Sequence, residues 1–107
     1  MVVFNSDIKF TDLGGGVMRK ILSRGGDMMA VEVSFEKGSV GAMHTHSHEQ
    51  ISYVLEGSFE LNINGEKSVI KKGDTYYVEP NVEHGVLALE VGKLLDIFTP
   101  QREDFLK

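Results

Sequence analysis

The sequence contains no cysteine, and this absence removes several classes of chemistry. Disulfide bonds, thiolate-bound zinc and cysteine nucleophiles are all excluded. Positive charge is also scarce, because 11 lysines and arginines stand against 16 aspartates and glutamates, which gives a net charge of -5. An acidic surface does not attract nucleic acid or anionic lipid, so we expect neither a nucleic-acid partner nor a membrane partner.

Basic leader segments and long apolar runs are missing as well. The N-terminal stretch MVVFNSDIKF has neither the basic start nor the apolar centre of a signal peptide, and no later stretch is long enough to cross a bilayer. We therefore expect a cytoplasmic protein. With 107 residues, of which 41% are hydrophobic and 25% charged, the chain has the length and composition of a single domain spanning residues 1–107.

No stretch shows a convincing helical period, whereas the period of a half-buried strand is common. In MMAVEVSF, residues 28–35, the larger apolar residues alternate with Ala, Glu and Ser. Asn64-Gly65 favours the positive backbone dihedrals of a type I′ turn and predicts a hairpin. Further strands are expected at 75–79, 85–90 and 93–99. Many short strands divided by turns predict an all-β sandwich or barrel.

The four histidines are the most informative residues of the chain. Three of them alternate at His44, His46 and His48, and the fourth is His84. Residues two apart on a strand face the same way, so His44 and His46 can direct their imidazoles at one divalent ion. Neutral imidazole suits Zn, Ni, Cu, Fe and similar ions. The competing interpretation is a solvated loop with an unrelated His84, and three histidines within five residues make it the weaker one.

The spacing of these residues resembles the two sequence motifs of the cupins. The positions of Gly38, His44, His46, Gln50 and Gly57 have the spacing of the first motif, and residues 73–84 have the spacing of the second. The resemblance implies an all-β fold, a cupin-type antiparallel β-barrel or jelly roll. It also implies one divalent metal ion (Zn, Ni, Mn, Fe or Co) inside the barrel, with the ligands His44, His46, Gln50 and His84.

Several positions around these motifs leave alternatives open. Cupins usually have Glu where this chain has Gln50, and a neutral amide leaves the metal with more of its Lewis acidity. The adjacent Glu49 is a competing ligand. His48 falls in the expected turn at 47–49, so we expect it outside the ligand set, either supporting a ligand or contacting the substrate. Asn81 replaces a glycine of the second motif and is one of the few residue types that tolerate a left-handed backbone.

An acid near the C-terminus is the second candidate for chemistry. In the strand expected at 93–99, Asp96 shares a face with Leu94 and Phe98. An Asp among apolar neighbours carries a desolvation cost unless a charged or hydrogen-bonding group meets it. A salt bridge with Arg102 that ties down the tail is one explanation. Inside a cupin barrel, Asp96 becomes a candidate general acid or base, Arg102 a partner for a substrate carboxylate and Phe98 an apolar wall.

Nearly the whole chain is similar to the pectin-degradation cupins of the KdgF type. The similarity runs through GGGVMRKIL, MAVEVSFEKGSVGAMHTHSHEQISYVLEG, GDTYYVEPNVEHGVLALE and LLDIFTPQREDFL. It implies an enzyme that opens the ring of 4,5-unsaturated monouronates, which pectate and alginate lyases release, to give open-chain keto acids. It also implies Gln50 as a metal ligand, and catalytic or substrate-binding roles for Asp96, Phe98 and Arg102.

Other functions remain compatible with the histidines. A metal-dependent dioxygenase or isomerase would share them, and a non-catalytic sugar-binding cupin and a structural barrel without metal are further alternatives. The ligand set fits several ions, and no residue separates galacturonate-derived from glucuronate-derived substrates. If Gln50 points inward, then Ile51, Tyr53 and Leu55 point outward. We therefore expect an apolar outer face and a homodimer.

Overall fold

The computed structural model describes residues 1–107, and its regular structure is almost entirely strand. None of its helical segments has the length and apolar character needed to cross a membrane. The elements, in chain order, are η1 (Asn5–Asp7), β1 (Thr11–Gly14), β2 (Val17–Gly25), β3 (Met28–Phe35), β4 (Val40–His44), β5 (Glu49–Glu56), β6 (Ser58–Ile63), β7 (Glu66–Lys71), β8 (Thr75–Val78), β9 (His84–Ala88), β10 (Gly92–Thr99) and η2 (Glu103–Leu106).

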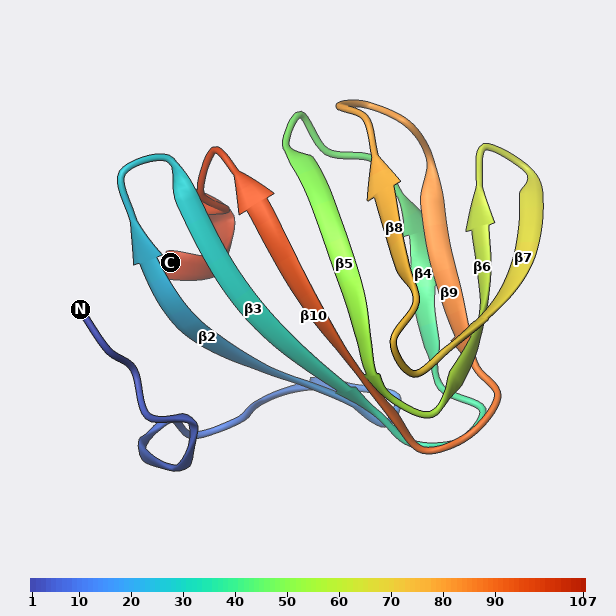
Figure 1. The fold of residues 1–107 in the computed structure, drawn as a ribbon, viewed down its shortest axis with the longest axis horizontal. Coiled ribbons are helices and arrows are strands. Elements are labelled where there is room, and N and C mark those ends of the chain that lie inside the picture. Colours follow the sequence, from blue (N-terminus) through green and yellow to red (C-terminus); the bar gives the residue numbers. More distant parts are fainter.

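The strands form two antiparallel sheets that approach each other at one end and splay apart at the other (Figure 1). The larger sheet has the order β1-β2-β3-β10-β5-β8 and the smaller one the order β4-β9-β6-β7. The prediction of an all-β antiparallel jelly roll is confirmed. The predicted barrel is not closed, because no strand pairs with both sheets through backbone hydrogen bonds.

Apolar side chains on the facing sides of the two sheets form the core. In β3 the predicted alternation places Val31 and Phe35 inside. Phe35 packs edge to face against Phe59 of the other sheet, with the ring centroids 5.2 Å apart. The packing of large buried side chains from both sheets fixes their relative position. The main cluster consists of Val17, Phe35, Val54, Phe59, Leu61, Ile70, Val86, Ala88 and Leu94.

Two tight turns follow the backbone preferences of their residues. Asn64 and Gly65, at φ 53° and 87°, join β6 to β7 and confirm the predicted type I′ hairpin. Asn81 has φ 67°, which confirms the left-handed backbone expected there. The Asn81 backbone N–H donates to the carbonyl of His46 at 2.7 Å. This turn therefore fixes the loop that carries His46.

The N-terminal quarter departs most from the expectations. The strands expected at 75–79, 85–90 and 93–99 appear within two residues of their predicted limits, but β1 and β2 were not expected. Glu32 lies on the polar side of β3, yet it is only 6% exposed. The N-terminal segment covers it: Asn5 Nδ2 donates to Glu32 Oε1 at 3.0 Å, and Lys20 Nζ donates to Asn5 Oδ1 at 2.8 Å. A local pattern cannot show this cover, because the covering residue lies 27 positions away.

Candidate metal centre and active site

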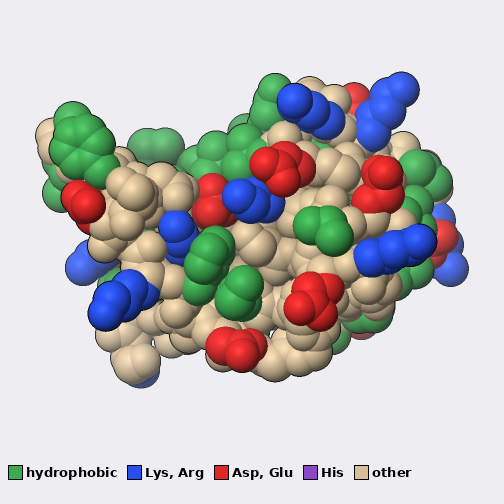
Figure 2. All heavy atoms as spheres, turned by 90° about the horizontal axis from the view of Figure 1, so that it is seen from below, with side chains coloured by type: hydrophobic (Ala, Val, Ile, Leu, Met, Phe, Trp, Pro, Cys, Tyr) green, Lys and Arg blue, Asp and Glu red, His purple; other side chains and the backbone are tan.

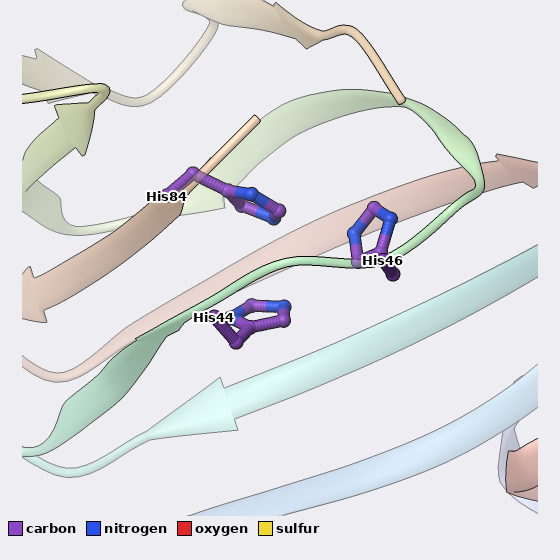
Figure 3. Close-up of side chains that lie close together, drawn as sticks. All are labelled: His44, His46 and His84. Atoms are coloured by element: carbon purple, nitrogen blue, oxygen red, sulfur yellow. The ribbon is translucent and has the colours of Figure 1, made fainter. Parts of the chain in front are cut away.

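Three histidines meet between the two sheets. His44 is the last residue of β4 and pairs with His84, the first residue of β9. His46 lies two residues beyond the end of β4, so the prediction that both histidines lie on one strand end is correct for His44 only. The three rings point toward one another (Figure 3), and their ligating nitrogen atoms all lie within 4.8 Å of one another.

The backbone fixes the protonation of these rings. Backbone carbonyls only accept hydrogen bonds, so each Nδ1 that meets one must carry the proton, which leaves Nε2 as the free acceptor. A metal-binding histidine has this arrangement, since the hydrogen bond of one ring nitrogen determines that the other binds the ion. The Nδ1–carbonyl pairs are His44–Ala42 (2.8 Å), His46–His48 (2.9 Å) and His84–Val82 (2.9 Å).

The buried rings are held in the neutral form that binds metals. Burial lowers the pKa of His84 to about 4, and burial likewise lowers the pKa of His46. His84 Nε2 is buried and has no hydrogen-bond partner in the protein. An unsatisfied buried polar atom of this kind costs about 1–3 kcal/mol. A metal ion shared with the other two rings would satisfy it, so the residues present fit a divalent ion.

Gln50 and Glu49 point to opposite faces of β5. Gln50 is 4% exposed, and its Oε1 lies 3.0 Å from His46 Nε2. Because His46 Nδ1 holds the proton, two acceptors face each other there, an arrangement that a shared cation stabilises. Gln50 Nε2 donates to Ser52 Oγ at 2.8 Å, which turns Oε1 toward the histidines. Glu49 is exposed and accepts a hydrogen bond from the Tyr77 hydroxyl at 2.6 Å. The structure thus brings Gln50, not Glu49, to the histidine group.

Asp96 is joined to this group through one hydroxyl. Ser52 lies opposite Asp96 in the β5–β10 pairing, and its Oγ donates to Asp96 Oδ1 at 2.5 Å. Asp96 is one of the residues that line the cavity between the sheets. Burial raises the pKa of Asp96 to about 6, against the opposing effects of the Ser52 hydrogen bond and the positive charge of Arg102. A continuous chain therefore runs from His46 through Gln50 and Ser52 to a carboxyl group with a raised pKa.

Arg102 lies beside this carboxyl group but pairs with a different acid. Its Nε and Nη2 donate to the two carboxylate oxygens of Asp104, at 3.1 and 2.9 Å. No Asp96–Arg102 salt bridge forms. The interpretation that Asp96 is buried in order to pair with Arg102 and tie down the tail is therefore wrong. The Arg102 guanidinium lies 5.1 Å from the centre of the Phe98 ring. Phe98 is 2% exposed and also packs edge to face on His46, at 5.6 Å between centroids.

A cavity of about 170 Å³ connects these groups. Pockets for drug-sized ligands measure about 300–1,000 Å³, so this cavity suits a smaller molecule. The end of the molecule seen from below displays acidic and basic side chains but no histidine (Figure 2). Most of the residues that the sequence predicted line this one space, namely His44, Gln50, His84, Asp96, Phe98 and Arg102.

Ser52, which is buried beside the cavity, and Arg19, which lines it, were not predicted, although the alternation of strand residues could have found both. Ser52 shares the inward face of β5 with Gln50, and Arg19 shares the inward face of β2 with Val17. His48 lies outside the metal group, as expected. Its carbonyl accepts the hydrogen bond of His46 Nδ1, so one contribution of this position is to orient a ligand through the backbone.

We expect Asp96→Asn to stabilise the metal-free protein at alkaline pH. The folded-state pKa of Asp96 is about 6 against an ordinary 3.8, so the contribution of this group to stability falls as pH rises from about 4 to 6. Above pH 6 the buried charge costs about 2–3 kcal/mol. The variant should therefore unfold several degrees higher than the wild type at pH 8 but not at pH 4, as measured by thermal unfolding.

Asp104→Asn is the matched control for this experiment. The hydrogen bonds from Arg102 lower the pKa of Asp104, so its ionised form stabilises the folded state and the variant should gain nothing at pH 8. Equal unfolding temperatures for Asp96→Asn and the wild type at pH 8 would show that the Asp96 carboxylate is not desolvated.

Comparisons with known proteins identify the family of this chain. The family model described as the cupin domain matches residues 31–98. The chain is 46% identical over 104 residues to the pectin degradation protein KdgF of Dickeya dadantii (strain 3937), which covers 95% of this chain and 94% of that protein.

Solved structures give the same result. The structure of KdgF from Halomonas sp. matches with a TM-score of 0.94 and 37% identity, over 98% of this chain and 97% of that one. An RmlC-like cupin from Shewanella frigidimarina NCIMB 400 matches with a TM-score of 0.94 and 41% identity, over 97% and 94% of the two chains. The chain therefore belongs to the cupin family, in which it is a relative of KdgF over nearly its whole length.

Proposed function

We propose that this protein, acting as a single cupin domain, opens the ring of 4,5-unsaturated monouronates from pectin or alginate breakdown to give open-chain keto acids. One observation carries the proposal: Asp96 lines the same cavity as the histidine group and is joined to Gln50 through Ser52. Three of the four proposed metal ligands and the proposed proton-transfer group, Asp96, therefore line the same small cavity. The relation to a pectin degradation protein supports the class of substrate.

Four neutral groups would hold the metal ion. The imidazole Nε2 atoms and the Gln50 amide oxygen carry no charge, so a divalent ion bound there keeps its full positive charge toward the substrate. The ion would supply Lewis acidity, which stabilises negative charge on a substrate oxygen. The ligand set that we propose is His44, His46, Gln50 and His84.

Asp96 would move the proton. Its Oδ1 is held by the Ser52 hydroxyl at 2.5 Å, which orients the carboxylate toward the cavity. As the carboxylate, Asp96 accepts the proton of the anomeric hydroxyl while the bond between C1 and the ring oxygen breaks. C1 becomes an aldehyde, and the ring oxygen becomes an enolate. The protonated Asp96 then returns the proton to C4, which leaves a ketone at C5 and removes the double bond.

Arg102 and Phe98 would position the substrate. The guanidinium of Arg102 keeps one edge free after its bonds to Asp104, and a planar edge of this kind fits a carboxylate. Phe98 presents a buried apolar wall next to His46, which excludes water from one side of the cavity. Together they would hold the sugar ring with its anomeric hydroxyl near Asp96.

The direct test follows the conjugated double bond of 4,5-unsaturated galacturonate. Metal-loaded protein should accelerate the loss of its ultraviolet absorbance beyond the spontaneous rate, without consuming oxygen in a parallel electrode measurement. Oxygen uptake coupled to substrate loss would instead identify a dioxygenase. Binding of the sugar with no acceleration would identify a non-catalytic sugar-binding cupin.

We also propose that the outer face of the larger sheet pairs with a second copy of the chain. Ile51 and Tyr53 are 53% and 42% exposed on β5, and Tyr77 of β8 lies directly opposite Ile51. Light scattering should give the mass of a dimer for the wild type and of a monomer for Ile51→Glu. Val69→Glu, at an exposed apolar position on the smaller sheet, should remain a dimer. A monomeric wild type at micromolar concentration would overturn this proposal.

A further inference from the structure

One cationic side chain of the cavity has no assigned role. Arg19 lies on β2, pairs with Val33 of β3, and lines the same cavity as Asp96 and the histidines. It is half-buried, yet it takes part in no hydrogen bond and no salt bridge with another side chain, and it stacks on the Phe105 ring. Burial lowers the pKa of Arg19, and the charges of Asp104 and Arg102 act on it in opposite directions. A partly buried guanidinium without a paired anion loses solvation that nothing in the protein replaces. Such a group in a ligand cavity points to an anionic ligand.

The surroundings of Arg19 supply too little negative charge. The guanidinium carbons of Arg19 and Arg102 lie 3.9 and 4.2 Å from the centre of the same Phe105 ring. Asp104 forms two hydrogen bonds with Arg102 and none with Arg19, although its charge acts on Arg19 as well. Two guanidinium groups therefore share one carboxylate.

Asp96, the acid that lines the cavity, does not supply the missing charge. Asp96 forms no salt bridge with either arginine. Its Oδ1 instead accepts a hydrogen bond from the Ser52 hydroxyl. The Phe105 ring covers Arg19 but leaves its hydrogen-bonding edges free, because a stacked guanidinium contacts the ring through its face. These edges can receive a carboxylate in the two-bond geometry that arginine favours.

We propose that Arg19 anchors the substrate by binding its carboxylate, together with the free edge of Arg102. The assignment of a uronate as the ligand rests on the proposed function. Arg19 then decides which sugars enter: acidic sugars are retained, and neutral sugars of the same shape are not. It is a substrate-binding residue, separate from the proton transfer at Asp96.

The experiment compares two arginines of the same strand. Arg24 lies at the exposed end of β2, where it donates to Gln101 Oε1 at 3.1 Å, away from the cavity. We would measure calorimetrically the binding of galacturonate and galactose to metal-loaded wild type, Arg19→Met and Arg24→Met. Arg19→Met should weaken galacturonate binding about tenfold or more, leave galactose unchanged and raise KM for ring opening by a similar factor. Arg24→Met should behave like the wild type.

Each outcome decides the proposal. Unchanged galacturonate binding in a less thermostable Arg19→Met would show that Arg19 only packs on Phe105. A wild type that does not distinguish galacturonate from galactose would also overturn the anchor. Galacturonate binding that depends on Arg19, in a protein with no ring-opening activity, would support the anchor and refute the proposed function. If the methionine variant does not fold, Arg19→Gln, which keeps a hydrogen-bonding head without the charge, provides the same comparison.

Discussion

His46→Ala should abolish metal binding. The substitution removes one of three converging imidazole nitrogens and also the contact with Gln50. Loss of a hydrogen-bonding partner behind a ligand already weakens metal affinity about 10–100-fold, so loss of the ligand itself should exceed about a hundredfold. Elemental analysis after dialysis should find about one metal ion per wild-type chain and almost none in the variant.

His48→Ala is the matched control for this loss. It removes a histidine from the same loop but keeps the backbone carbonyl that accepts the hydrogen bond from His46 Nδ1–H. The control should therefore retain its metal. Full retention of metal by His46→Ala, or equal loss in both variants, would contradict the ligand assignment.

Asp96→Asn should slow ring opening while the metal stays bound. The amide keeps the shape of the side chain and can still accept the hydrogen bond from Ser52, but it cannot accept a proton. General acid–base groups contribute about a hundredfold or more, of which the spontaneous reaction can mask a part. Rates from ultraviolet absorbance, corrected for the spontaneous reaction and measured alongside metal content, test this prediction.

Ser52→Ala separates orientation from proton transfer. It keeps the Asp96 carboxylate but removes the hydroxyl that orients it. The same hydroxyl accepts the hydrogen bond from Gln50 Nε2, so the comparison is made at equal metal content. We expect a smaller loss of kcat than for Asp96→Asn. An undiminished rate in metal-loaded Asp96→Asn would show that Asp96 is not the proton-transfer group.

The fold was predictable wherever strand signals are local. The alternation in β3 and the Asn64-Gly65 turn each report the conformation of their own residues, and both predictions are confirmed. The burial of Glu32 was not predictable, because it depends on contact with Asn5 from the N-terminal segment. The division into two sheets without continuous hydrogen bonding depends on long-range strand pairing in the same way.

The candidate site was predictable in its membership but less so in its geometry. Motif spacing indicated the histidines and Gln50, and it agrees with where these residues lie. Strand alternation alone could not bring His46 to the metal group, because His46 lies in a loop held by the backbone N–H of Asn81. The pairing of Arg102 with Asp104 instead of Asp96 likewise depends on the path of the chain after β10.

The most direct test of a metal-dependent ring-opening centre is a titration of metal-free protein with a divalent ion while ring opening is followed by ultraviolet absorbance. The rate above the spontaneous reaction should rise with added ion and reach a plateau at about one equivalent per chain. A rate that is the same without metal and at the plateau, in protein shown by elemental analysis to have lost and regained the ion, would contradict this account.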